Sequence, residues 1–180
     1  MRLKWIAKLL SRVLPPRRPP DKLIYGASAT DPYLSRWNLI FPQNKWLNIM
    51  VHEYHRSDDD RANHDHPWWN VSFVLRGALM EWRGKHSEGG VHLLVQGDVV
   101  RRAPETAHRI ELLPPPRPTS PVTLFVTGRK VREWGFWCPK GWRHNKEFVS
   151  PKDDGFIGRG CDYATQPRRR RLWNSQAEAA

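Results

Sequence analysis

Residues Asn63–Gly77 read NHDHPWWNVSFVLRG, and they join two histidines to a short apolar run. His64 and His66 stand two positions apart, and in an extended chain residues i and i+2 project from the same face. Two imidazoles at this spacing can therefore reach one metal ion from a single strand. The run Asn70–Leu75 that follows has the length of a strand, and the turn-forming pair Arg76-Gly77 comes directly after it.

Short apolar segments recur on both sides of this stretch, separated by turn-forming residues and without a helical period between them. This texture predicts an all-β domain, an antiparallel sandwich or barrel. The proline-rich run Pro114–Pro121 is expected to be an exposed loop. The expected strands are Trp46–Tyr54, Asn70–Leu75, Ala78–Trp82, Val91–Val95, Asp98–Arg102, His108–Leu112 and Val122–Thr127.

The spacing of the histidines and glycines resembles the two sequence motifs of the cupin superfamily. The first motif runs His-x-His, three or four residues, Glu, six residues, Gly, and here it begins at His64 and ends at Gly77. The second motif begins with Gly and ends eleven positions later with His, as Gly97 and His108 do. The resemblance covers about residues 45–130. It implies a jelly-roll barrel of the cupin double-stranded β-helix type, with a short N-terminal helix added.

The resemblance also implies a metal ion inside the barrel, held by His64, His66 and His108. Asn70 stands where the first motif has its acidic ligand, so the implied ligand set is three neutral histidines. Glu81 on the next strand could replace the missing acidic ligand if its side chain points inward. Alternation alone does not decide whether it does. The second motif also departs from the family pattern, since Ala103-Pro104-Glu105 replaces Pro-x-Gly.

Three imidazoles leave coordination positions open for water, substrate or O₂. Among cupins, such iron centres occur in dioxygenases, so the resemblance implies an Fe(II)-dependent dioxygenase-type enzyme acting on a small molecule. Mn, Ni or Zn also suits three imidazoles. Arg109 and Arg132 are candidates for holding a substrate carboxylate or phosphate. The aromatic-rich residues 132–148, with Trp68 and Trp69, are expected either to wall a pocket at the metal or to pack as a lid over the barrel.

The net charge of +12 is concentrated at the two ends of the chain. Residues 1–22 carry +6 and residues 165–180 carry +3. We expect residues 1–22 to form a basic amphipathic helix over 2–14 and a proline-rich linker, residues 23–164 the barrel, and residues 165–180 a basic flexible tail. The helix is expected either to dock on the barrel or to lie on an anionic membrane surface.

Two alternatives to an enzyme remain open. One is a cupin that binds a metal or small ligand without turnover, and the other is an accessory protein that binds nucleic acid or a membrane through its basic ends. A homodimer is compatible with the family. Cys138 and Cys161 are too few for a disulfide framework, and the basic residues of the first fourteen positions argue against a secretory signal, so a cytoplasmic location is expected.

Overall fold

A computed structural model describes residues 3–25, 32–40, 42–58, 62–114, 120–148 and 160–161 of the chain. Strands dominate this part of the chain, and each of the seven predicted strands is present with ends shifted by at most two residues. The elements are α1 (Lys4–Leu10), β1 (Lys22–Ile24), β2 (Leu34–Asn38), β3 (Asn48–Tyr54), β4 (Asn63–His64), β5 (Asn70–Arg76), β6 (Ala78–Arg83), β7 (Val91–Val95), β8 (Val99–Arg102), β9 (His108–Leu112), β10 (Val122–Thr127), β11 (Gly135–Cys138), β12 (Gly141–His144) and α2 (Asn145–Phe148).

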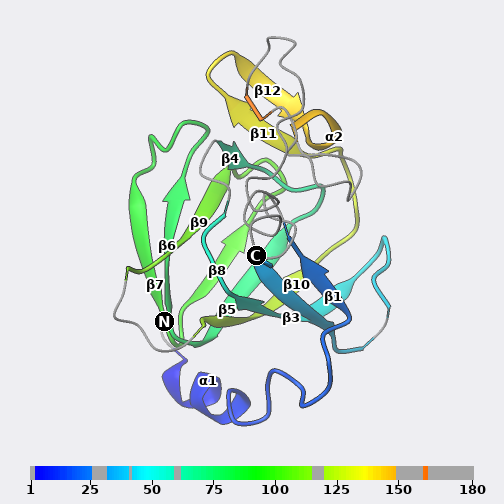
Figure 1. Cartoon of the computed structure of the whole chain (residues 1–180), viewed down its shortest axis with the longest axis vertical. Coiled ribbons are helices and arrows are strands. Elements are labelled where there is room, and N and C mark those ends of the chain that lie inside the picture. The colour runs from blue at the N-terminus through cyan, green and yellow to red at the C-terminus, as the bar shows by residue number, and fades with distance from the viewer. Residues whose placement is uncertain are drawn as a thin grey trace, which may run out of the picture.

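The described strands form two antiparallel six-stranded sheets. One has the order β1-β2-β3-β10-β5-β8 and the other β12-β11-β4-β9-β6-β7 (Figure 1). The pairs β3–β10, β4–β9, β5–β8 and β6–β7 are nested, each inside the one before it. This pairing is that of a long hairpin folded over on itself, which is a jelly roll. The expected double-stranded β-helix is therefore confirmed by the strand topology.

The space between the sheets is divided into an apolar part and a polar part. The apolar part is a cluster of buried side chains from both sheets, among them Leu34, Val74, Leu79 and Ile110. The polar part contains buried residues that occupy alternate positions of the same strands, where a period of two directs them inward. These buried polar residues include His52, Asn70, Ser72, Glu81, Arg102, His108 and Thr123.

The helix α1 covers the outer face of the first sheet. Ala7 is fully buried against Trp37, Val51 and Phe73, while Leu3, Ile6, Leu10 and Leu14 pack around it. In the structure the helix therefore docks on the sheet, which is one of the two arrangements expected from the sequence. It is shorter than the expected 2–14 because the chain turns at residues 11–13, ahead of Pro15.

The two glycines of the cupin-like motifs occupy turns that need them. Gly77 joins β5 to β6 with φ of 77°, and Gly97 joins β7 to β8 with φ of 93°. Side chains other than glycine rarely adopt this region. At Gly97 a Cβ would also lie 2.7 Å from the backbone nitrogen of Lys4, so this turn admits α1 only because it carries no side chain.

The aromatic-rich segment forms a hairpin that sequence periodicity did not predict. β11 and β12 pair with each other, and β11 extends the second sheet beside β4. Cys138, at the end of β11, forms a disulfide with Cys161. Disulfides persist mainly in oxidising compartments, whereas the cytoplasm, which we expected from the sequence, is reducing. The cytoplasmic location stays a prediction.

The predicted loop 114–121 and the predicted tail 165–180 lie mostly or wholly outside the described residues.

Within the described part of the chain, neither helix has the length and apolar character needed to cross a bilayer.

Candidate metal centre

Three histidines that are distant in sequence converge in the polar part of the jelly roll. His64 on β4 pairs directly with His108 on β9, and His66 follows two positions later. The ring centroids lie 5.1 Å apart for His64 and His66, 4.9 Å for His64 and His108, and 5.1 Å for His66 and His108. One nitrogen from each ring lies within 4.8 Å of the others, so the three residues form a group that can hold a metal ion.

Two of the ring nitrogens are in hydrogen-bond contact and are close enough to be neighbouring ligands of one ion. Nε2 of His66 lies 2.8 Å from Nε2 of His108. Imidazole nitrogens bind a first-row metal at about 2.0–2.1 Å, so a separation of 2.8 Å corresponds to an angle of about 90° at the metal. His64 and His66 are half-buried and His108 is buried.

Burial keeps two of these imidazoles in the state that binds metal. Desolvation and, next, the positive charge of Arg102 lower the pKa of His108 to about 4, although the contact with Glu81 opposes the shift. Desolvation also places the pKa of His66 well below its ordinary value, with His64 and His108 contributing. Both rings are therefore neutral at neutral pH, with a lone pair available for a ligand bond.

A buried carboxylate lies behind His108. The side chain of Glu81 is fully buried on β6, and its Oε1 is 2.9 Å from Nδ1 of His108 and 2.5 Å from Nε of Arg102. Burial opposes its ionisation, but the contacts with His108 and Arg102 outweigh burial and lower the pKa of Glu81. Glu81 thus points inward, as one alternative held, and faces the ring nitrogen of His108 that is turned away from His66.

Asn70, which stands where the cupin motif has its acidic ligand, contacts the buried Arg102. Nη1 of the buried Arg102 donates hydrogen bonds to Oδ1 of Asn70, at 3.0 Å, and to Oγ of Ser72, at 2.9 Å. Asn70 and Arg102 stand opposite each other on β5 and β8. The position of the expected acidic ligand is therefore part of a buried network around a guanidinium.

Asp65, between the two histidines, is a positioning residue that the sequence analysis did not identify. It faces away from the metal group and is fully buried under the β11–β12 hairpin. Its Oδ1 accepts from the backbone N–H of Gly135 at 2.9 Å, and its Oδ2 accepts from the indole N–H groups of Trp137 and Trp142 at 3.2 and 2.9 Å. An acid inside His-x-His was the available signal, because alternation turns the middle residue to the opposite face.

The two arginines singled out as substrate-binding candidates both contact other residues of the fold, and their role toward a substrate stays a prediction. Nη1 of Arg132 is 3.0 Å from Oδ2 of Asp65 and donates at 3.4 Å to the backbone oxygen of His66, so Arg132 holds the chain that carries the histidines. Arg109 follows His108 and lies on the other face of β9. Its guanidinium lies 4.6 Å from the centre of the Trp82 ring and pairs with Glu111 at 3.4 Å.

The aromatic side chains divide between the two roles expected of them. Trp134 and Phe136 lie 6.3 and 5.8 Å from the His64 ring, measured between centroids, and form a wall beside the metal group. Phe136 also stacks on Phe148 at 3.6 Å, in a small core with Cys138. The segment is therefore partly a wall of the site and partly a packed cap.

The sequence matches no protein-family model and no curated protein. Solved structures similar to the chain include a cupin superfamily protein from Desulfitobacterium hafniense, with 14% identity over 53% of this chain and 77% of that one and a TM-score of 0.41. An RmlC-like cupin from Shewanella frigidimarina has 22% identity over 56% and 79%, with a TM-score of 0.42. The DMSP lyase DddQ from Ruegeria pomeroyi has 17% identity over 69% and 61%, with a TM-score of 0.47. These are similarities of fold, and the double-stranded β-helix is assigned from the strand pairing itself.

Proposed function

We propose that the chain binds one divalent metal ion, Fe(II), through His64, His66 and His108 and acts as a dioxygenase-type enzyme on a small molecule. The observation that carries the proposal is the convergence of three imidazoles, two of them kept neutral by burial, with Nε2 of His66 and Nε2 of His108 2.8 Å apart. A metal bound there would offer open positions at which O₂ and substrate are held in reaction geometry.

The surrounding residues support this proposal by orienting the ligands. Oε1 of Glu81 faces Nδ1 of His108 at 2.9 Å, and a carboxylate there would favour the tautomer that carries its proton on Nδ1 and leaves the Nε2 lone pair for the metal. Asp58 faces His64 in a similar way but at a longer distance, with its Oδ2 4.0 Å from Nδ1 of His64. Arg132 and Asp65 fix the backbone of His66 from the opposite side.

The charge of the ligand set indicates the class of substrate. Three neutral imidazoles compensate none of the charge of a divalent ion, and the nearby Glu81 is already paired with Arg102. The open face would therefore favour an anionic substrate, such as a thiolate, an enolate or a phenolate, that binds the metal directly. The aromatic wall of Trp134 and Phe136 would exclude water from its organic part.

Oxygen uptake tests the proposal. Anaerobically purified protein is loaded with Fe(II) and mixed with thiols, β-diketones and phenols in an O₂ electrode. We expect uptake above autoxidation with one of these classes, lost in His66→Ala and retained in His86→Ala, since His86 is an exposed histidine outside the group. Metal-loaded protein that consumes no O₂ with the whole panel contradicts the enzyme and favours a non-catalytic metal-binding cupin. Uptake that persists in His66→Ala places the reaction outside the histidine group.

A further inference from the structure

The outward face of α1 carries large apolar side chains that the fold does not use. Its inward face is buried against the first sheet through Ala7 and its neighbours. Trp5 is 72% exposed, Leu9 is 55% exposed, and Val13, in the turn after the helix, is 66% exposed. Trp5 and Leu9 are four residues apart, so they stand one above the other on the same side of the helix.

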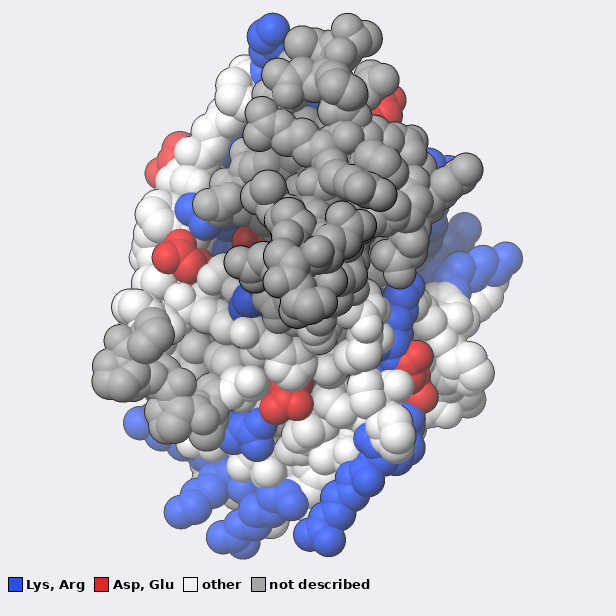
Figure 2. All heavy atoms as spheres, viewed as in Figure 1, with Lys and Arg blue, Asp and Glu red and all other residues white. Residues whose placement is uncertain are grey.

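Few acidic side chains compensate the positive charges around Trp5, Leu9 and Val13. Among residues 3–25 the only acid is Asp21, which pairs with Arg18 at 2.6 Å. The net charge of this segment is therefore +5, six cations against one acid. Lys and Arg side chains gather at the α1 end of the molecule in Figure 2. The six exposed cations are Lys4, Lys8, Arg12, Arg17, Arg18 and Lys22.

Contacts at the start of α1 orient the helix with its outer face toward solvent. The N–H of Leu3 donates to the backbone oxygen of Gly97 at 2.8 Å, and the glycine turn at 97 lies directly against Lys4. Rotation of α1 to bury Trp5 would expose Ala7 and Leu10 and break this contact. The exposure of Trp5 and Leu9 therefore follows from the way in which the helix packs on the first sheet.

We propose that α1 docks the protein on an anionic lipid bilayer, with Trp5 and Leu9 inserted among the headgroups and the surrounding cations on lipid phosphates. A tryptophan next to an aliphatic side chain, flanked by Lys and Arg, is the pattern of an interfacial helix. Nucleic acid would be attracted by the same cations but would leave Leu9 and Val13 without a partner. The metal group lies beside the β11–β12 hairpin, at the end of the molecule away from α1, so docking leaves it accessible (Figure 1).

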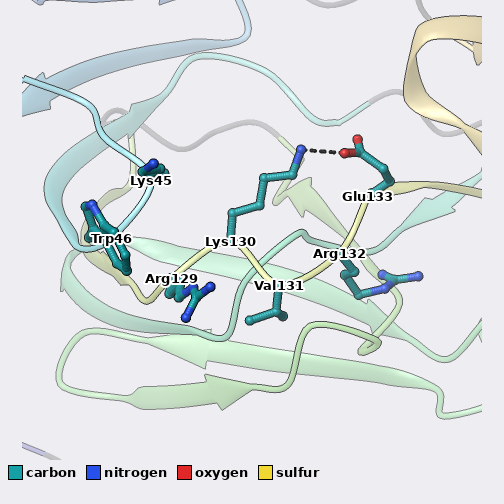
Figure 3. A pocket seen from close by; sticks show the side chains of 7 residues that line it. All are labelled: Lys45, Trp46, Arg129, Lys130, Val131, Arg132 and Glu133. Carbon is teal, nitrogen blue, oxygen red and sulfur yellow. Dashed lines mark hydrogen bonds and ion pairs between the residues drawn. The ribbon is translucent and has the colours of Figure 1, made fainter.

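A second surface of similar composition supplies a matched control. Trp46 is 58% exposed, and the charged groups of Lys45 and Arg129 lie 5.4 and 5.2 Å from its ring centre. These residues line a pocket of about 470 Å³ together with residues 130–133 (Figure 3). An exposed tryptophan and two cations are thus present there without a docked helix.

Co-sedimentation of the full chain with vesicles tests the proposal. The vesicles are phosphatidylcholine alone or phosphatidylcholine with one third phosphatidylglycerol, and circular dichroism confirms that each variant is folded. We expect sedimentation with the anionic vesicles only. Lys4→Gln/Lys8→Gln/Arg12→Gln should lower the partition coefficient about fivefold per charge, on the order of a hundredfold in all.

Removing the apolar pair should act separately from removing charge. We expect Trp5→Ala/Leu9→Ala to lower vesicle binding by about tenfold or more, and Trp46→Ala with Lys45→Gln and Arg129→Gln to leave it unchanged. The proposal is overturned if no variant binds less than the wild type, since other basic segments would then hold the vesicles. It is equally overturned if the protein ignores anionic vesicles, or binds only single-stranded or duplex DNA with no effect of Trp5→Ala/Leu9→Ala.

Discussion

Replacing Glu81 by Gln tests whether the carboxylate behind His108 supports both the fold and the site. The substitution keeps the shape of the side chain and removes a charge that contacts Arg102 at 2.5 Å and His108 at 2.9 Å. Arg102 is buried and has no other carboxylate among its contacts in the described structure. Breaking a buried pair by removing one partner leaves an uncompensated charge, which costs about 3–5 kcal/mol.

The assay is urea denaturation of the metal-free protein, followed by a metal titration. We expect Glu81→Gln to lower the free energy of unfolding by about 3–5 kcal/mol and to weaken metal binding by about 10–100-fold. The control is Arg83→Gln. Nη2 of Arg83 lies 2.7 Å from Oε2 of the same Glu81 carboxylate, but the Arg83 side chain is one-third exposed. Its cost should stay below about 1 kcal/mol, because solvent screens the pair. A loss of under 1 kcal/mol for Glu81→Gln would refute the buried-charge reasoning.

Three further changes have outcomes set by the structure, each measured by chemical denaturation. Asp65→Asn removes the charge that faces Arg132 and should cost about 1.5–3 kcal/mol, whereas an unchanged midpoint would contradict the clamp under the hairpin. Ala7→Leu adds volume at a fully buried position and should cost about 1–3 kcal/mol, and a neutral result would mean that α1 is not packed as described. Cys138→Ala with Cys161→Ala opens a crosslink between residues 23 apart and should cost about 3 kcal/mol, and no difference between the oxidised protein and the variant would contradict the disulfide.

Local patterns predicted seven of the twelve described strands and the pair His64 and His66, because both depend on neighbouring residues. Alternation and turn-forming glycines identify a strand within a few positions, and Gly77 and Gly97 have the positive φ that makes glycine necessary there. His64 and His66 face the same side because side chains alternate with a period of two along an extended chain. His108 was reached only through the resemblance in spacing, and the register of β4 with β9 now places it opposite His64.

The residues that support the histidines could not be predicted in the same way. Asp65 meets Trp142 across 77 positions of sequence, and Arg102 meets Asn70 across 32. Such contacts depend on how sheets and hairpins pack, which no short window records. Arg109 is a different case, because one step along β9 from His108 turns the side chain to the other face of the sheet, and this alternation is a local pattern.

The most direct test of the metal centre is the metal content of the folded protein. Anaerobically purified protein is incubated with Fe(II), freed of excess metal and analysed by elemental mass spectrometry, beside His64→Ala/His108→Ala and the surface control His86→Ala. The account predicts close to one metal ion per chain in the wild type and the control, and almost none in the double variant. A folded wild type that retains no metal, or a double variant that retains as much as the wild type, would contradict it.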